Sequence, residues 1–238
     1  MKKYIFAALM MLCLTGLTAC DDGRIYKEQK FDSIGRAAKL TGTLTGMQNW
    51  PSSYSLAVAG FVEGDEYAVF SRTLTKTDGD VSVVVTNIDD KVTSIQFCLL
   101  DRLRRHVITF YEAETEGVRD TVRLDVGKLD VSMYNVIQQN YFNTTCANCH
   151  GASNRVAADL YLTEGKSYGA LVNADSRRVE GMKLVEPGNA EASVLHMVLH
   201  QESVEGISMN HFDLVSESSG TNILPIIDTW INNGAKEK

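Results

Sequence analysis

The segment Cys146-Ala147-Asn148-Cys149-His150 constrains this chain more than any other part of its sequence. Two cysteines separated by two residues and followed directly by a histidine form the attachment signature of c-type haem. The two thiols add across the vinyl groups of the porphyrin, and the adjacent imidazole binds the iron from one side. The sequence therefore predicts one covalently bound haem c, held by Cys146 and Cys149, with His150 as its proximal ligand.

Two other chemistries use a pair of cysteines at this spacing. Cys146 and Cys149 could combine with His196 and His200 in a Cys2His2 zinc site, because the two histidines stand four residues apart. The gap between the two pairs is much longer than in zinc fingers, and His150 would have no role. A thioredoxin-like dithiol needs a preceding strand, whereas the residues before Cys146 have a helical pattern. Haem attachment is the favoured interpretation, with the other two as alternatives.

The first residues of the chain have the features of an export signal. Lys2 and Lys3 precede an apolar run from Ile5 to Leu17, as in the charged and apolar regions of a secretory leader. The run is too short to span a bilayer as a helix. We therefore expect residues 1–19 to be a signal peptide that is removed on export.

The leader ends in Leu17-Thr18-Ala19-Cys20, which resembles the lipobox of bacterial lipoproteins. The resemblance implies that Cys20 is lipidated after cleavage, and several acyl chains give durable membrane attachment. An ordinary cleaved signal, with Cys20 incidental, is the alternative. We expect residues 20–36 to be a lipidated tether. The protein would then be lipid-anchored in the bacterial cell envelope, periplasmic or at the cell surface, with the outer membrane favoured.

Composition and charge narrow the functional classes. With 44% hydrophobic and 22% charged residues, the chain is typical of a folded soluble protein. The 30 acidic residues outnumber the 23 basic ones, which argues against a nucleic-acid partner. Cys98 is the one cysteine outside the leader, the lipidation position and the haem motif, and its apolar neighbours predict a small buried hydrophobe. No disulfide framework is expected.

Residues 37–127 are predicted to form an all-β sandwich of Ig-like architecture. Short runs of β-branched and aromatic residues alternate with turn residues in this part of the chain. The runs are 55–62, 81–85, 93–99, 107–111 and 118–126. About seven strands over this length favour a sandwich, although the diagnostic cysteine pair of antibody domains is absent. His106, which follows two arginines, is expected at the surface rather than in a metal site.

After Asp130 the periodicity becomes helical, and Asp130 or Ser132 is a candidate helix cap. Residues 131–238 resemble a single-haem, class I-type cytochrome c domain of the kind found in bacterial envelope proteins. The matching stretches are 137–142, 146–151, 160–162, 168–173, 185–189, 193–195 and 227–235. The resemblance covers slightly under half of the chain, and it implies an all-α cytochrome c-like domain over residues 131–238.

The resemblance also implies a methionine as distal haem ligand, shortly before the last helix. That position falls on Met209, which is followed by Asn210 instead of the proline usual in the family. The expected metal ligands are therefore His150 and Met209. The alternative distal ligands are His211, His200, His196, Met197 and Met182. Trp230 is a candidate for packing against the haem, or a core residue.

Together these features predict a membrane-anchored, mono-haem c-type cytochrome that transfers electrons in the bacterial cell envelope and is not itself an enzyme. The iron would change between ferric and ferrous states while both ligands stay in place. The redox partner is expected to be a protein, and its identity is open. A function of another class is the alternative. In it, the β domain of a surface or periplasmic lipoprotein recognises a protein or a glycan, and the haem is structural or sensory.

Overall fold

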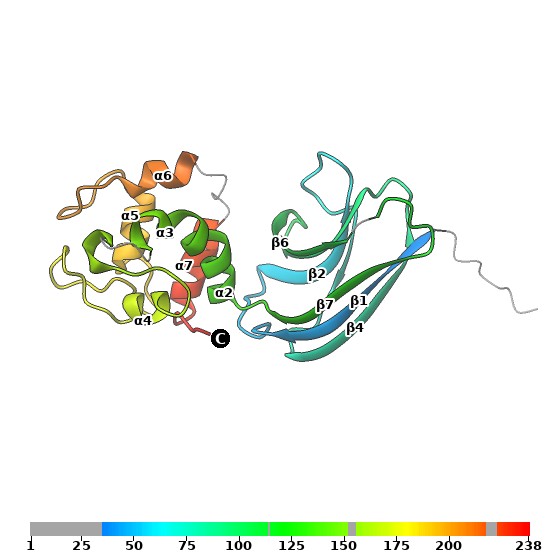
Figure 1. Cartoon of the computed structure of the whole chain (residues 1–238), viewed down its shortest axis with the longest axis horizontal. Helices are drawn as coiled ribbons and strands as arrows, with labels where there is room; N and C mark the ends of the chain where they lie inside the picture. The colour runs from blue at the N-terminus through cyan, green and yellow to red at the C-terminus, as the bar shows by residue number, and fades with distance from the viewer. Residues whose placement is uncertain (1–34, 114, 152–155, 218–222) are drawn as a thin grey trace, which may run out of the picture. The chain divides into compact units, whose positions relative to one another are not determined.

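The computed structural model of the 238-residue chain describes residues 35–113, 115–151, 156–217 and 223–238 (Figure 1). The predicted signal peptide, Cys20 and almost all of the predicted tether lie outside the described residues. Residues Gly35–Lys238 form one compact unit. Among the residues that the structure describes, no helix combines the length and the apolar character needed to cross a bilayer.

Seven strands form two sheets in the first part of this unit. The first sheet consists of β1 (Arg36–Thr45), β4 (Gly79–Ile88) and β7 (Thr121–Asp130). The second consists of β2 (Tyr54–Phe61), β3 (Phe70–Thr73), β5 (Ser94–Asp101) and β6 (His106–Ala113). In the first sheet, β1 lies between β4 and β7, antiparallel to β4 and parallel to β7 (Figure 1). The order in the second sheet is β3-β2-β5-β6, and all neighbours are antiparallel.

Alternation of side chains decides which face of the first sheet is buried. Leu40 and Leu44 on β1 and Leu124 on β7 are fully buried, while the residues between them are more exposed. They share one hydrophobic cluster with residues of the second sheet such as Leu56 and Phe97. The predicted runs overlap β2, β4, β5, β6 and β7, whereas β1 and β3 were not predicted.

Strands β2 and β5 are buried on both faces over most of their length, which explains their largely apolar sequences. Their second faces contribute to a small cluster that contains Cys98, Ala57, Phe61 and Leu100. The Cys98 side chain is fully buried, as predicted for a small hydrophobe, and burial raises the pKa of its thiol to about 12.

The predicted Ig-like architecture was wrong. In an immunoglobulin sandwich, the first, second, fourth and fifth strands share one sheet, and the third, sixth and seventh share the other. Here the first strand pairs with the fourth and seventh, and the second sheet contains the second, third, fifth and sixth. Strand count and alternation do not determine this order, because it depends on pairing between residues far apart in the chain.

A continuous helical segment follows the last strand and leads to the cysteine motif. It consists of α2 (Met133–Ile137), the π-helix η1 (Gln138–Cys146) and α3 (Ala147–His150). The hydroxyl of Ser132 accepts a hydrogen bond of 3.3 Å from the backbone N–H of Asn135, so Ser132 caps the segment, as one of the two predicted caps.

The remaining regular elements are short. They are η2 (Ala157–Asp159), α4 (Ser167–Leu171), α5 (Val194–His200), α6 (His211–Glu217) and α7 (Leu224–Asn232). Between α4 and α5 the chain consists of turns and bends joined by isolated bridges, such as Val172 to Val185 and Lys183 to Ser193. Gly234 follows α7 with a φ of 90°, a conformation that suits glycine at a helix end.

The predicted separate all-α cytochrome c-like domain over residues 131–238 was also wrong. The unit is mostly β, and its helical elements are pieces of three to nine residues. The buried residues of these helices, including Trp230 of α7, belong to the same hydrophobic cluster as Leu40 of β1. One connected cluster of buried residues therefore runs from the sheets into these helical elements.

Candidate functional site

The two cysteines of the motif lie on consecutive helical elements. Cys146 ends η1 and is partly buried, whereas Cys149 lies in α3 and is exposed. Both are free thiols. Burial, together with the nearby Cys149, raises the pKa of the Cys146 thiol to about 12. The structure therefore presents two unpaired sulfurs at the end of one helical segment, one of them open to solvent.

Close packing at the end of α3 explains the glycine after the motif. A Cβ atom at Gly151 would lie 2.3 Å from the carbonyl oxygen of Ala147, which is far inside van der Waals contact. Glycine allows the backbone to leave the helix directly after His150, in an extended conformation.

The imidazole of His150 has one nitrogen engaged by the backbone. Its Nδ1 atom lies 3.1 Å from the carbonyl oxygen of Ala157 and 3.2 Å from that of Leu160. Carbonyls only accept hydrogen bonds, so Nδ1 carries the proton and donates it. The carbonyl of His150 itself accepts a bond of 2.8 Å from the N–H of Leu162. A histidine held in this way presents Nε2 with a free lone pair, which is the arrangement common among metal-binding histidines.

A second imidazole faces His150. The ring of His211, at the start of α6, has its centre 6.4 Å from that of His150, and the two ring planes differ by only 20°. Its Nδ1 donates a hydrogen bond of 3.0 Å to the carbonyl oxygen of Met209, which leaves its Nε2 available as well. Burial and the nearby His150 lower the pKa of His211, against the opposing effect of the bond to Met209. The lowered pKa favours the neutral imidazole, which is the form that binds metal ions.

The structure places Met209 differently from the distal-ligand prediction. Its side chain is 55% exposed, and the part of Met209 that takes part in the site is its backbone carbonyl. Met182 and Met197 are partly buried, in the loop after α4 and in α5. Among the candidates for the distal position, the structure brings His211 to face His150.

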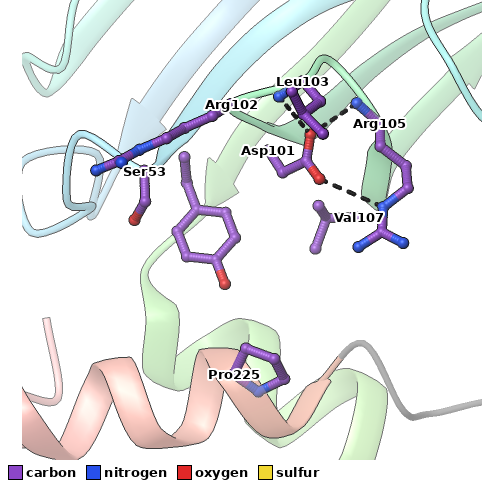
Figure 2. A pocket seen from close by; sticks show the side chains of 8 residues that line it. Ser53, Asp101, Arg102, Leu103, Arg105, Val107 and Pro225 are labelled. Atoms are coloured by element: carbon purple, nitrogen blue, oxygen red, sulfur yellow. Dashed lines mark hydrogen bonds and ion pairs between the residues drawn. The ribbon is translucent and has the colours of Figure 1, made fainter.

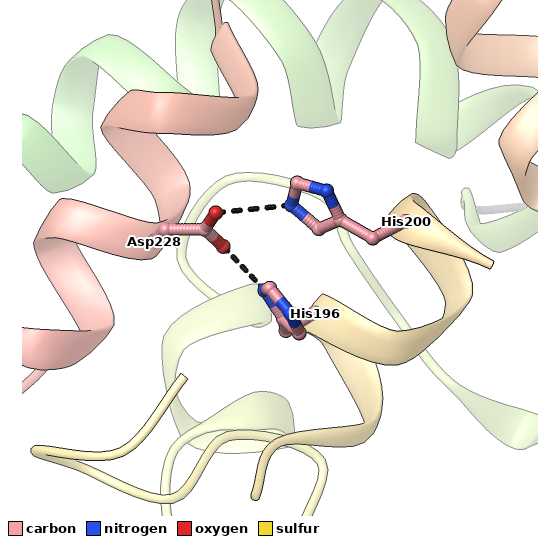
Figure 3. A group of neighbouring side chains, drawn as sticks. All are labelled: His196, His200 and Asp228. Atoms are coloured by element: carbon pink, nitrogen blue, oxygen red, sulfur yellow. Dashed lines mark hydrogen bonds and ion pairs between the residues drawn. The ribbon is translucent and has the colours of Figure 1, made fainter. Parts of the chain in front are cut away.

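His196 and His200 have another partner. Nδ1 of His196 lies 2.7 Å from one carboxylate oxygen of Asp228, and Nε2 of His200 lies 3.0 Å from the other (Figure 3). Among the described residues, the His, Cys, Asp and Glu side chains close enough to share a metal ion are these three, without Cys146 or Cys149. The Cys2His2 zinc arrangement therefore does not match the grouping in the structure. Asp228 was not predicted, because it lies 32 residues after His196 in the chain.

Trp230 is a core residue in this structure. Its side chain is fully buried, its Nε1 donates a hydrogen bond of 2.7 Å to the carbonyl of Lys236, and its ring centre lies 5.4 Å from that of Tyr134. The contact with Tyr134 holds α7 against α2, and α2 directly precedes the segment that carries the cysteines. Packing against haem stays a prediction.

A buried polar network supports the same segment and was not predicted. Gln138, at the start of η1, accepts hydrogen bonds from the hydroxyls of Tyr134 and Ser167. Its amide nitrogen donates to the carbonyl oxygen of Leu162 at 3.1 Å and to the side chain of Asn143 at 2.7 Å. A buried amide with both its donors and its acceptor satisfied fixes η1 against α4 and against the residues after His150. Its sequence signal was a glutamine at a buried helical position.

A pocket of about 500 Å³ is lined by residues of β2, β5, β6 and the loop between β5 and β6, and by Pro225 of α7 (Figure 2). Asp101 is its acidic group, but its carboxylate accepts bonds from the N–H groups of Leu103 and Arg105, both 2.8 Å, and pairs with the Arg105 guanidinium. These bonds hold the Asp101 carboxylate against the loop between β5 and β6. His106, at the start of β6, packs against Phe61 and bonds to Thr109.

Comparison with known proteins gives no relative for this chain: no family model, no curated protein and no solved structure matches it.

Proposed function

We propose that this protein is a mono-haem c-type cytochrome that carries electrons in the bacterial cell envelope, attached to the membrane through lipid on Cys20. Cys146 and Cys149 would hold the haem through thioether bonds, and His150 would bind its iron. The observation that carries the proposal is the environment of His150, which follows two free thiols and has Nδ1 bonded to two backbone carbonyls. Bound haem supplies a one-electron couple between ferric and ferrous iron.

The residues around the motif have defined tasks in this proposal. The carbonyls of Ala157 and Leu160 hold the His150 ring in one orientation, with Nε2 facing away from them. The Gln138 network keeps the helical segment in place behind the cysteines. Cys149 is exposed, so the attachment edge of the haem would lie near the surface, where a redox partner can approach.

For the distal position we favour His211 over Met209, which remains the ligand that the family resemblance implies. Both imidazoles would bind the iron through Nε2, so their rings would have to lie close to one another. The separation of the His150 and His211 rings is 6.4 Å. The bond from His211 to the Met209 carbonyl leaves the correct nitrogen free, whereas the Met209 side chain is largely exposed.

Production in a host with the haem-attachment machinery tests the central claim. We expect a mass one haem above that of the polypeptide, and a pyridine haemochrome spectrum of haem c. The variant Cys146→Ala/Cys149→Ala should lose all haem to acidic organic solvent. Cys98→Ala is the matched control, because Cys98 is a cysteine outside the motif, and it should keep its haem. Colourless wild-type protein from such a host would refute the proposal.

The distal ligand is tested by comparing His211→Ala with Met209→Ala in the same host. Loss of the sixth ligand changes the reduced spectrum from low-spin, six-coordinate to high-spin, five-coordinate. We expect this change in His211→Ala, while Met209→Ala keeps a low-spin spectrum. The opposite pattern would establish Met209 as the ligand and leave covalent attachment of the haem untouched.

A further inference from the structure

A second group of potential ligands lies on α5 and α7, separate from the cysteine motif. His196 and His200 stand four residues apart on α5, which places both rings on one face of the helix. Asp228 reaches them from α7, and the two ring centres are 4.2 Å apart (Figure 3). We call these three residues the His–Asp cluster.

The ligand atoms of the His–Asp cluster converge. One nitrogen of each histidine and a carboxylate oxygen of Asp228 all lie within 4.8 Å of one another. The two contacts to Asp228 measure 2.7 and 3.0 Å. Ligand atoms around a tetrahedral zinc ion, at about 2.0–2.1 Å from it, are about 3.3 Å apart. Small rotations of the side chains would therefore place all three atoms at zinc-binding distance.

The chemistry and the accessibility of the cluster also suit zinc. Two imidazoles and one carboxylate, with a water molecule in the fourth position, form a known type of zinc ligand set. The side chains of His196, His200 and Asp228 are 21%, 34% and 24% exposed, so an ion and its water molecule can reach them from solvent. A hydrogen-bonded link between the two helices would need only one histidine, whereas here a second imidazole is directed at the same carboxylate.

We propose that His196, His200 and Asp228 form a binding site for one zinc ion, which links α5 to α7. Each imidazole would bind as the neutral form through the nitrogen that now faces Asp228, with its proton on the other ring nitrogen. The site does not depend on haem. It would stabilise α7, the helix that carries the buried Trp230 two residues after Asp228.

The test is zinc binding to the full chain after treatment with chelator and dialysis. Metal content at about 10 µM free zinc is measured by mass spectrometry, and the melting temperature is measured with and without zinc. We expect one zinc ion per chain and a higher melting temperature with zinc. His200→Gln and Asp228→Asn should each weaken binding at least tenfold, since loss of even an outer-shell partner costs that much.

Two controls locate the ion. His106→Gln removes a histidine of β6 outside the cluster, and Cys149→Ser removes an exposed thiol of the haem motif; both should bind zinc as wild type does. The proposal is overturned if wild-type protein binds no zinc at this concentration. It is also overturned if zinc content is unchanged in His200→Gln, or is lost only in Cys149→Ser. Haem absorbance, measured on the same samples, should be equal in wild type and His200→Gln, which separates this result from the fate of the haem proposal.

Discussion

Substitution of Trp230 tests whether the sheets and the helices share one core. Trp230 is fully buried, packs against Tyr134 and donates a hydrogen bond to the carbonyl of Lys236. Truncation of a buried tryptophan to alanine costs about 3–5 kcal/mol. Loss of the hydrogen bond adds about 1 kcal/mol. We therefore expect Trp230→Ala to lower the free energy of unfolding by about 4–6 kcal/mol. In a unit of this size, that lowers the melting temperature by roughly 10–20 °C.

Thermal unfolding followed by circular dichroism gives the size of the effect, and hydrogen exchange with mass spectrometry shows where it acts. Because residues of β1 and α7 belong to one cluster, peptides from β1, β5 and α7 should lose protection together in Trp230→Ala. Trp230→Phe keeps an aromatic ring and should show a smaller shift in the same direction. Leu103→Ala is the control, since Leu103 is 73% exposed and its truncation should change stability by less than about 0.5 kcal/mol.

The result that would refute this reasoning is a local one. If peptides of β1 and β5 exchange as in wild type while α2 and α7 lose all protection, the helices form their own cooperative unit. The shared core would then contribute little to the stability of the sheets. Equal melting temperatures of Trp230→Ala and Leu103→Ala would show that the burial of Trp230 does not stabilise the fold.

Three further predictions concern single positions. Burial raises the pKa of Cys98 from 9.0 to about 12, which lowers its thiolate fraction at pH 8 about a thousandfold. Alkylation of Cys98, followed by peptide mass spectrometry, should therefore be slower by at least that factor in folded than in urea-unfolded protein. Equal rates would contradict its burial. Gly151→Ala forces a side chain against the Ala147 carbonyl and should cost about 1–3 kcal/mol of folding free energy, which lowers both the melting temperature and the haem content per chain. Unchanged values of both would show that the backbone adjusts freely. Ser167→Ala removes a hydrogen bond to Gln138 from a buried network and should cost about 1–3 kcal/mol in urea unfolding, whereas an unchanged midpoint would mean that Gln138 finds another partner.

The sequence predicted the elements whose patterns are local. The apolar runs of β2 and β5, the alternation along β7 and the cap at Ser132 depend on neighbouring residues, and each lies where the sequence analysis placed it. Strand β1 was missed because Arg36–Thr45 contains many small and polar residues. It is stabilised as a strand by pairing with β4 and β7, which contribute neighbours 35 or more residues away along the chain.

The same distinction between local patterns and long-range contacts applies to the candidate site. Cys146, Cys149 and His150 form one continuous motif, so their proximity follows from the chain itself. The proximity of His150 and His211, and the contact of Asp228 with two histidines of α5, arise from how the short helices pack against one another. The family pattern favoured Met209 by its position in the chain, but the Met209 side chain is exposed in the structure. The imidazole near His150 is that of His211, two residues later, at the start of α6. A shift of two residues in a loop is enough to exchange one candidate ligand for another. The backbone at the start of the helix decides which side chain faces inward, and the spacing from the haem motif does not.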